Sequence, residues 1–499
     1  MIFLGIDCGT QSTKTIALDW ENGQVLASAQ EAYGFVPGLP SGSMEQEPAD
    51  WTRAAENTIA EVLRSLGGRK AEVRGIGVSG QQHGLVPLDK DGQVVRPAKL
   101  WCDTSTTPQC REITEHFGGV AEIIRRTGNA MLPGYTAPKI LWLRQNEPEN
   151  WEKTSLVLLP HDYLNYWLTG KASMEPGDAS GMALLDISRR EWAADVVNFV
   201  APDLAEKLPP LRPSSEAAGD LRPELAARWG LSEGICVSAG GGDNMMGAIG
   251  TGNIRPGVVT ASLGTSGTLY AYSETPIIDP KGEVAGFCDS TGAWLPLVCT
   301  MNLTIVTEHV RKLFGWGVAE FDRQVESAPV GAGGLLFLPY LTGERTPNLP
   351  DGTGVLHGLS TANLTPAHLA RAATEGATLG LAYGLGRFRE LGVHPTEIRL
   401  TGGGSNSRVW RQICADIFGV PVVCLRSGEG AGLGAALQAG WTWENTQGQV
   451  VPMESVCARL VEVDETSRVA PIAENVQAYK PILAKMDTLR DHLHGASFL

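Results

Sequence analysis

The run Ala239–Asn244 places a single carboxylate, Asp243, directly after three glycines. Because glycine has no side chain, a reacting group can come close to Asp243. The carboxylate could then accept a proton from a substrate hydroxyl while a phosphoryl group is transferred in line. Asp is also a favoured helix N-cap, so Asp243 could instead cap a helix over Met245–Ile249. The two interpretations are compatible with each other.

Two turns rich in glycine and hydroxyl groups have the composition of phosphate-binding loops. The first, Asp7–Lys14, follows a short apolar run, and the second is Gly264–Gly267. Successive backbone N–H groups and hydroxyls in such turns can cradle phosphate oxygens. Asp7 could in addition hold Mg²⁺ through water. A polar hairpin turn without a ligand explains each segment too, and for the second turn it is the better explanation when that turn is taken alone.

Two other glycine-rich turns have the composition of ligand-binding loops. Gly80–Gly84 reads Gly-Gln-Gln-His-Gly, and its donors and acceptors suit recognition of a polyol. Taken alone, His83 is more often a surface histidine than a ligand-binding one. In Gly402–Asn406, a base or a phosphate can approach the backbone at a helix N-terminus. The sequence has no Walker A motif, no protein-kinase motif set and no complete dinucleotide fingerprint, so ATP would need a different fold.

The elements that must position these turns are predicted from hydrophobic periodicity. The chain begins with a β-meander whose second turn is Asn22-Gly23, a strong hairpin signal. The order strand, glycine-hydroxyl turn, strand recurs near residue 260, which indicates a weak repeat at the scale of a domain. The main predicted strands are 1–6, 14–20, 24–31, 73–79, 235–239, 258–263, 268–272, 398–401 and 420–425. The main predicted helices are 47–66, 138–145, 162–168, 364–391, 408–418 and one beginning in 434–440.

Length and composition indicate a two-domain globular protein. The chain has 499 residues, of which 43% are hydrophobic and 19% charged. Single cores stop growing near roughly 250–300 residues, so we expect domains over 1–250 and 251–499, facing each other across a cleft. The formal net charge of −15 comes with no basic footprint, which argues against a nucleic-acid partner.

Cysteine usage and the N-terminal residues favour a cytoplasmic protein. The nine cysteines are odd in number and include no C-x-x-C motif, which fits free thiols in a reducing compartment. The start MIFLGIDCGT lacks a basic region followed by a long apolar one, so we predict no signal peptide. No apolar run approaches the roughly 18 residues of a spanning helix, so we predict no membrane association.

Taken together and in this order, the motifs resemble those of the FGGY carbohydrate kinases. The shared motifs are Ile6-Asp7 with Gly9-Thr10, Gly80–Gly84, Gly240–Asn244 and Ser262–Gly267. Further stretches resemble the branch of that family that phosphorylates ketopentoses. They are Leu100-Trp101 with Asp103, Met131–Lys139, Leu159-Pro160 with Asp162-Tyr163, Phe337–Pro347 and Glu429–Ala436. The resemblance extends from residue 2 to about residue 440.

The resemblance implies an α/β fold of two actin-like ATPase (ribonuclease H-like) domains with a ligand cleft between them. By position, Asp243 matches the catalytic base and Asp7 the aspartate associated with Mg²⁺. The residues implied to bind the sugar are Gln82, His83, Asp243, Asn244, Trp101 and Asp103. Those implied to bind ATP are Thr10, Gln11, Ser12, Lys14, Gly264, Thr265, Gly403, Gly404 and Asn406. The sugar site and first phosphate loop fall in 1–250, and the second phosphate loop and adenosine site in 251–499.

The resemblance implies phosphorylation of a ketopentose by ATP, with D-xylulose and its 5-hydroxyl favoured. A kinase for ribulose, fuculose or gluconate is the alternative within the family, and Gln82-His83 argues against a glycerol kinase, where Arg-Glu is expected. A non-catalytic sugar sensor of the same superfamily is the alternative of another class, but it would not need Asp243. The stretch 300–316 departs from the small-residue-rich helix expected there, which bears on the choice of sugar. The oligomeric state is left open, with a homodimer among the alternatives.

Overall fold

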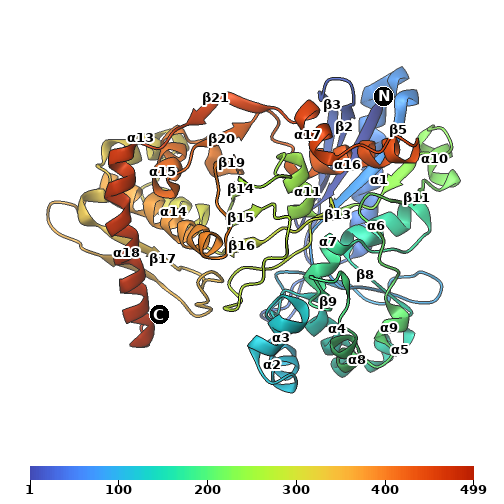
Figure 1. The fold of residues 1–499 in the computed structure, drawn as a ribbon, viewed down its shortest axis with the longest axis horizontal. Helices are drawn as coiled ribbons and strands as arrows, with labels where there is room; N and C mark the ends of the chain where they lie inside the picture. The colour runs from blue at the N-terminus through green and yellow to red at the C-terminus, as the bar shows by residue number, and fades with distance from the viewer. The chain divides into compact units, whose positions relative to one another are not determined.

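The computed structural model describes residues 1–499, which form two compact units (Figure 1). Unit 1 comprises Met1–Arg255, Tyr272–Pro296 and Glu429–Val461. Unit 2 comprises Pro256–Ala271, Leu297–Gly428 and Glu462–Leu499. The division differs from a single boundary near residue 250, because Tyr272–Pro296 and Glu429–Val461 group with unit 1.

Unit 1 is built on a mixed sheet in the order β11-β12-β5-β1-β2-β3, with β13 also paired to β5. Its strands are β1 (Ile2–Cys8), β2 (Ser12–Asp19), β3 (Val25–Ala32), β5 (Val73–Gly80), β11 (Ala217–Asp220), β12 (Cys236–Ser238) and β13 (Gly241–Gly242). The predicted meander is confirmed: β1, β2 and β3 pair antiparallel in sequence order. Strand β5 then pairs parallel with β1, and β13 pairs parallel with β5.

Helix α1 (Pro48–Leu66) closes the core of unit 1, close to the predicted span 47–66. Pro48 stands in its first turn, where a missing N–H costs nothing. Its buried face includes Trp51, Ile59 and Val62, which pack in the same apolar cluster as Ile2, Leu4 and Ile6 of β1. Burying such side chains contributes roughly 1.5–3 kcal/mol each.

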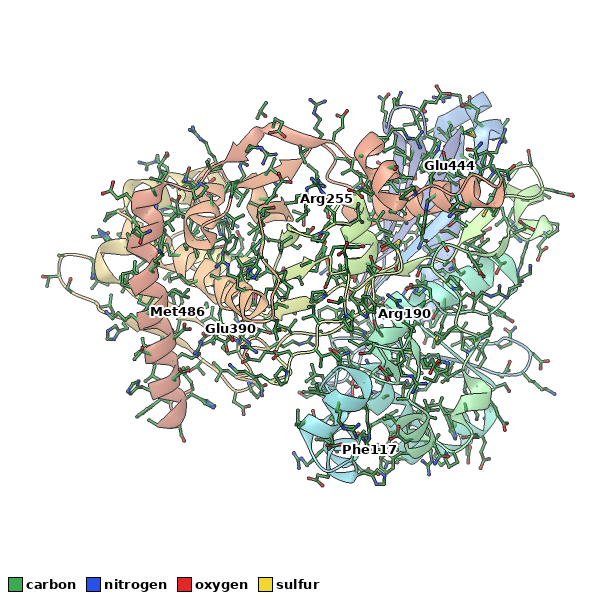
Figure 2. The ribbon with its side chains drawn as sticks, in the orientation of Figure 1. Phe117, Arg190, Arg255, Glu390, Glu444 and Met486 are labelled. Carbon is green, nitrogen blue, oxygen red and sulfur yellow. The ribbon has the colours of Figure 1, made fainter.

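Helix α16 (Gly430–Thr446) explains why a late segment belongs to unit 1. It packs on β1 and β5 and against α11 (Asp243–Gly250), as Figure 1 shows. A Cβ at Gly5 would lie 2.0 Å from the carbonyl oxygen of Gly432, and one at Gly77 would lie 2.0 Å from that of Ala435. The glycines therefore permit a backbone approach that no other residue allows. Glu444, labelled on α16 in Figure 2, also accepts a hydrogen bond of 2.7 Å from Trp20 Nε1.

The remaining elements of unit 1 surround the sheet. The short strands pair as β4 (Glu45–Gln46) with β7 (Ala98–Lys99), β6 (Val86–Leu88) with β8 (Leu156–Leu158), and β9 (Leu185–Asp186) with β10 (Glu191–Trp192). The helices are α2 (Thr107–His116), α3 (Val120–Thr127), α4 (Thr136–Asn146), α5 (Pro148–Lys153), α6 (Pro160–Thr169), α7 (Pro176–Ala179), α8 (Ala194–Val200), α9 (Leu204–Lys207), α10 (Pro223–Trp229) and α17 (Met453–Leu460), with 3₁₀ turns at Gly67–Glu72 and Ser180–Met182.

Unit 2 repeats the strand pattern of unit 1. Its sheet has the order β16-β15-β14-β19-β20-β21, and β14 pairs antiparallel with β15 but parallel with β19. The strands are β14 (Val258–Leu263), β15 (Gly267–Ala271), β16 (Leu297–Thr300), β19 (Glu397–Thr401), β20 (Val422–Leu425) and β21 (Val463–Val469), beside a separate hairpin of β17 (Leu336–Pro339) and β18 (Gly354–His357). The weak sequence repeat therefore corresponds to the same meander in each sheet.

The helices of unit 2 are α12 (Thr304–Leu313), α13 (Val318–Ser327), α14 (Pro366–Glu390), α15 (Arg408–Phe418) and α18 (Ala473–Gly495), with 3₁₀ turns at Ala332–Gly334 and Gly403–Asn406. Helix α14 confirms the long helix predicted over 364–391. Its cap is Thr365, whose side chain accepts a hydrogen bond from the N–H of His368. Met486, labelled in Figure 2, is one of the few buried residues of α18. None of the helices combines the length and the apolar character needed to cross a membrane.

Candidate active site

Three predicted site segments of unit 1 follow neighbouring parallel strands. Asp7 lies near the end of β1, opposite Ser79 of β5, and Gly80 of β5 lies opposite Gly242 of β13. The carboxyl ends of parallel strands meet at one edge of a sheet, which is where α/β proteins bind ligands. The fold thus brings Asp7, the turn at Gln82 and Asp243 to the same edge.

Asp243 is the first residue of α11, and Gly242 takes the N-cap position. No side chain caps this helix, so the predicted capping role of Asp243 is not what the structure shows. The Nδ2 group of Asn244 donates to Asp243 Oδ1 at 3.0 Å and to Gln82 Oε1 at 2.8 Å. Burial raises the pKa of Asp243 to about 7, helped by the charges of Asp7 and Asp178 and opposed by Asn244. A carboxylate with such a pKa is suited to accept a proton near neutral pH.

Asp7 is buried close to the negative charges of Glu429 and Asp243. Ser79 Oγ donates to Asp7 Oδ1 at 3.0 Å, yet burial raises the pKa of Asp7 overall, and Lys14 only partly opposes this. The repulsion between Asp7 and Asp243 would be relieved by a divalent cation. No group of three or more His, Cys, Asp or Glu side chains could hold a metal ion by itself. The donor set therefore fits Mg²⁺ only in the way this ion is commonly bound, through one carboxylate, water and substrate phosphate.

The Gln82–His83 turn has a strained and well-supported backbone. His83 has φ 64°, a left-handed conformation that is uncommon for a residue other than glycine. Its carbonyl oxygen accepts hydrogen bonds from Thr136 Oγ1 at 3.1 Å and Lys139 Nζ at 3.0 Å. Its ring contacts Tyr135 and Phe287, at centroid distances of 5.0 and 5.7 Å. Strain held in this way clusters at functional sites, which supports the predicted role of the turn.

Buried Gln46 connects this turn to the first hydroxyl-rich loop. Its Nε2 group donates to the Thr10 carbonyl at 2.6 Å, and its Oε1 accepts from Gln81 Nε2 at 2.9 Å and Trp51 Nε1 at 3.0 Å. The carbonyl of Gly9 accepts from Tyr33 Oη at 2.6 Å. Side chains from several elements therefore fix the backbone of the loop.

The other predicted residues of this loop differ in exposure and partners. Gln11 is exposed, and Ser12 Oγ accepts from Gln30 Nε2 at 2.7 Å. Lys14 Nζ forms an ion pair of 2.5 Å with Glu429, the residue before α16. The sequence motif Glu429–Ala436 thus reaches the first loop through this ion pair.

Trp101 and Asp103 have different surroundings. Trp101 Nε1 donates to Thr10 Oγ1 at 2.9 Å, which places Trp101 beside the first loop. Asp103 is fully buried and accepts from Lys99 Nζ, Ser105 and the N–H of Met44. These contacts show that Asp103 stabilises the conformation of its own loop. That Trp101 and Asp103 contact a sugar stays a prediction.

In unit 2, the second hydroxyl-rich turn joins β14 to β15. The carbonyls of Gly264 and Thr265 accept hydrogen bonds of 3.1 Å from the N–H groups of Thr304 and Leu303 at the start of α12. These N–H groups have no partner within the helix, so the turn satisfies them. Helix α12 lies in the divergent stretch 300–316, which here serves to hold the turn.

The Gly402–Asn406 segment follows β19, the parallel neighbour of β14, so it lies at the same sheet edge as Thr265. Gly402 has φ 79°, and a Cβ there would lie 2.7 Å from the backbone of Leu263. Gly403 and Asn406 are exposed, whereas Gly404 packs against Leu263. The structure thus places the predicted nucleotide residues of unit 2 at one sheet edge, with Gly403 and Asn406 exposed and Gly404 buried.

Several residues near the site were not found by sequence reasoning. Gln46, Tyr135 and Phe287 are distant in sequence from the turns they support, and nothing local marks them. Asp178 and His161 form a buried pair of 2.6 Å close to Gln82. The run Gly177-Asp178-Ala-Ser-Gly surrounds a carboxylate with small residues, as the run before Asp243 does, and that signal could have been used.

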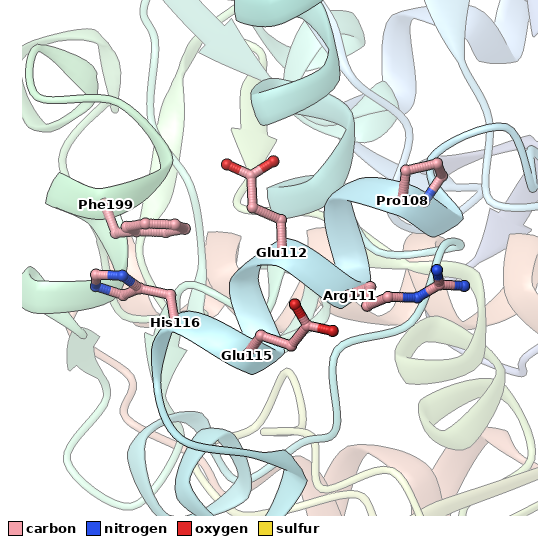
Figure 3. A pocket seen from close by; sticks show the side chains of 6 residues that line it. All are labelled: Pro108, Arg111, Glu112, Glu115, His116 and Phe199. Atoms are coloured by element: carbon pink, nitrogen blue, oxygen red, sulfur yellow. The ribbon is translucent and has the colours of Figure 1, made fainter.

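A surface hollow of unit 1 contains none of the predicted site residues. Figure 3 shows it against α2 and Phe199, lined by Pro108, Arg111, Glu112, Glu115, His116 and Phe199. His116 stacks on Phe199 with ring centroids 3.8 Å apart. Exposed charges of both signs line the hollow, and no buried polar group points to a ligand there.

Comparison with known proteins finds relatives that match nearly the whole chain. The chain is 42% identical over 485 residues to a xylulose kinase of Haemophilus influenzae, covering 96% of this chain and 97% of that protein. It is 37% identical to a xylulose kinase of Bacillus subtilis, covering 98% and 96%. A solved xylulose kinase from Brucella ovis superposes with a TM-score of 0.93 at 31% identity, covering 99% of this chain and 100% of that one.

The family models match both halves of the chain. The N-terminal domain model matches residues 2–250 and the C-terminal domain model residues 259–443. The superposition extends over the mixed α/β fold of the whole chain, which has the actin-like ATPase architecture of this family. The chain therefore belongs to the FGGY family of carbohydrate kinases and is an ATP-dependent sugar kinase.

Proposed function

We propose that this kinase transfers the γ-phosphoryl group of ATP to D-xylulose and forms D-xylulose 5-phosphate. The observation that carries the proposal is the chain of hydrogen bonds from Gln82 through Asn244 to Asp243, whose pKa is raised to about 7. It joins a polar recognition turn to a carboxylate that can accept a proton. Relatives 36–42% identical to this chain are named xylulose kinases, which favours this ketopentose.

Asp243 acts as the general base. As the 5-hydroxyl oxygen bonds to the γ-phosphorus, the bond between that phosphorus and the ADP oxygen breaks, and the hydroxyl proton passes to Asp243. The Asn244 amide, which donates to one oxygen of Asp243, fixes the direction of the carboxylate and leaves its other oxygen for the proton. Gln82 and His83 bind the sugar, with His83 held by the strained backbone of its turn.

Asp7 is the residue that would hold Mg²⁺, and this cation would supply charge neutralisation for the phosphates. In unit 1, the loop of Thr10, Gln11, Ser12 and Lys14 binds phosphate oxygens, with its backbone fixed by Gln46 and Tyr33. In unit 2, Gly264 and Thr265 bind phosphate, and Gly403, Gly404 and Asn406 form the adenosine loop, in which Gly403 and Asn406 are exposed. We also propose a cytoplasmic location, supported by nine free cysteines.

An ADP-release assay over a sugar panel tests this function. The panel contains D-xylulose, D-ribulose, L-fuculose, gluconate and glycerol, each with ATP and Mg²⁺, and water alone as the blank. We expect kcat/KM to be highest for D-xylulose, and phosphorus NMR to identify the 5-phosphate. A higher kcat/KM for another sugar would replace the proposed substrate, and ADP release independent of every sugar would contradict the proposal.

A further inference from the structure

A buried group of charges lies behind the Gln82–His83 turn, and we call its three residues His161, Asp162 and Asp178 the His161 cluster. His161 Nδ1 lies 2.6 Å from Asp178 Oδ2, and His161 Nε2 lies 2.9 Å from Asp162 Oδ1. All three side chains are at most 1% exposed. Burial disfavours the charged imidazole, but the two carboxylates outweigh it and raise the pKa of His161. The contacts with both carboxylates therefore favour the protonated form of the imidazole.

The two carboxylates of the cluster face different parts of the molecule. Asp162 Oδ2 accepts from the N–H of Leu159 at 3.1 Å and so caps the start of α6. Asp178 lies on α7, and its charge is one of the causes that raise the pKa of Asp243. Burial raises the pKa of Asp178, while hydrogen bonding from His161 and Gln82 opposes this. Of the pair, Asp178 is the one that acts on the site.

Glycines let the cluster pack against the backbone that leads into the site. A Cβ at Gly80, two residues before Gln82, would lie 2.8 Å from the backbone nitrogen of His161. A Cβ at Gly240, three residues before Asp243, would lie 3.0 Å from His161 Cδ2. The 3₁₀ turn after α7 also supports the site, since a Cβ at Gly181 would lie 2.2 Å from the His83 ring.

We propose that His161 and Asp178 are positioning residues that set the orientation of the Gln82 amide and, through Asn244, of the base Asp243. This inference rests on the proposed function. Gln82 Oε1 accepts from Asn244, and Gln82 Nε2 points the other way, where it donates to Met245 Sδ at 3.3 Å. A thioether is only a weak acceptor, and the same amide nitrogen also favours the ionised form of Asp178. An ionised Asp178 can only accept hydrogen bonds and therefore attracts that nitrogen. The His161 ring, 2.6 Å from Asp178 Oδ2, favours the ionised form of Asp178 against the effect of burial, and the preferred amide orientation follows.

A matched pair of variants tests the proposal. Asp178→Asn and Asp162→Asn each remove one negative charge from beside the same imidazole, at equal burial. We expect Asp178→Asn to lower kcat/KM for the sugar about 10²-fold, the size of effect that misplaced reacting groups produce, with the KM for ATP unchanged. We expect Asp162→Asn to change kcat/KM less than about threefold. Equal losses in the two variants, or a parallel rise in the KM for ATP, would overturn the proposal.

A second pair separates charge from packing at His161. His161→Gln removes the cation, and we expect it to match Asp178→Asn. His161→Lys restores a cation and should recover kcat/KM to within about tenfold of the wild type. No recovery in the lysine variant, with both proteins folded by circular dichroism, would overturn the role of the charge. If His161→Gln does not fold, the aspartate pair alone decides.

The wild-type enzyme separates this inference from the proposed function. If the wild type prefers a sugar other than D-xylulose, the substrate proposal fails. The variants are then assayed with the sugar that the wild type prefers. The positioning role fails only when Asp178→Asn and Asp162→Asn behave alike with the sugar that the wild type uses.

Discussion

The hydroxyl-rich turns of the two units have the same topology but are held in different ways. Each joins the first two strands of a meander whose first strand has a parallel neighbour. The turn at Thr10 is fixed by side chains, including Gln46 and Trp101. The turn at Thr265 is fixed by backbone N–H groups of α12. Function in unit 1 should therefore depend on individual side chains, and function in unit 2 on backbone shape.

The same contrast holds for the rest of each site. Unit 1 gathers two carboxylates with raised pKa values, Asp7 and Asp243, and a histidine in a strained conformation, His83. Unit 2 offers Gly402 with a left-handed backbone, and exposed Gly403. Acid–base chemistry needs titrating side chains, whereas a nucleotide can be bound by N–H groups and open backbone. Single substitutions in either unit test whether this difference between the two units holds.

The largest effect is expected at Asp243. Asp243→Asn keeps the shape of the side chain and its contact with Asn244 but cannot accept a proton. General base catalysis typically contributes about 10²–10⁴-fold, so kcat should fall by that range. Sugar binding, measured by calorimetry without nucleotide, should change little. A near-normal kcat would remove Asp243 from the role of base.

The pH dependence should follow the same carboxylate. Burial, together with Asp7 and Asp178, raises the pKa of Asp243 to about 7. The ionised form is the base, so kcat/KM for the sugar should rise with pH up to about 7 and then level off. Below that point the loss should approach tenfold per pH unit. No ionisable side chain lies within Gly402–Asn406, the proposed adenosine loop, so the Kd of adenosine for the Asp243→Asn protein should vary far less over the same range. An equal variation would break the contrast between the units.

The part of the site that sequence predicts is the part that lies next to strand ends. Asp7, Gln82 and Asp243 lie in glycine-containing segments at or just after the ends of buried strands, and periodicity locates those strands to within a few residues. Gln46 acts over a long sequence separation, and no local pattern marks it. Asp178 is marked only by the small residues around it, which do not say which turn it contacts. The capping role predicted for Asp243 failed because the helix begins one residue earlier than capping requires. Glu429–Val461 belongs to unit 1 because glycines let α16 pack closely on β1. A single sequence does not show that these two distant segments are in contact.

An intermediate effect is expected at Gln46, which tests whether side chains hold the first turn. Gln46→Leu keeps the approximate volume but removes the hydrogen bonds to the Thr10 carbonyl, Gln81 and Trp51. We expect kcat to fall about tenfold, since a buried donor or acceptor left without a partner shifts both turns. Gln30→Leu is the matched control, because Gln30 contacts Ser12 from an exposed position and should cost less than about twofold. Similar losses of kcat in both variants would contradict the proposal that the buried hydrogen bonds of Gln46 hold the first turn.

A backbone change should disturb unit 2. Gly402→Ala forces a side chain into a backbone region that essentially only glycine adopts, which costs about 1–3 kcal/mol, and places its Cβ against the backbone of Leu263. We expect the KM for ATP to rise about five- to tenfold while the KM for the sugar stays constant. Gly317→Ala is the control, since a Cβ there meets no atom within 4 Å and Gly317 has no proposed contact with the nucleotide. A rise in the sugar KM instead would contradict the assignment of this loop to the nucleotide.

The smallest effect is expected from Thr265→Ala. The carbonyls of Gly264 and Thr265, not the threonine hydroxyl, accept the hydrogen bonds from the start of α12, so the alanine variant keeps the turn intact. What it loses is one hydroxyl that could donate to phosphate, and a single neutral hydrogen bond contributes about 0.5–1.5 kcal/mol. The KM for ATP should therefore rise about two- to tenfold, with kcat nearly unchanged.

Thr10→Ala is the comparison in unit 1, where the hydroxyl also accepts from Trp101 Nε1 and its loss leaves that donor without its partner. We expect Thr10→Ala to lower kcat as well as raise the KM for ATP. If Thr265→Ala proves the more damaging of the two, side chains rather than backbone govern the second turn and the contrast between the units does not hold.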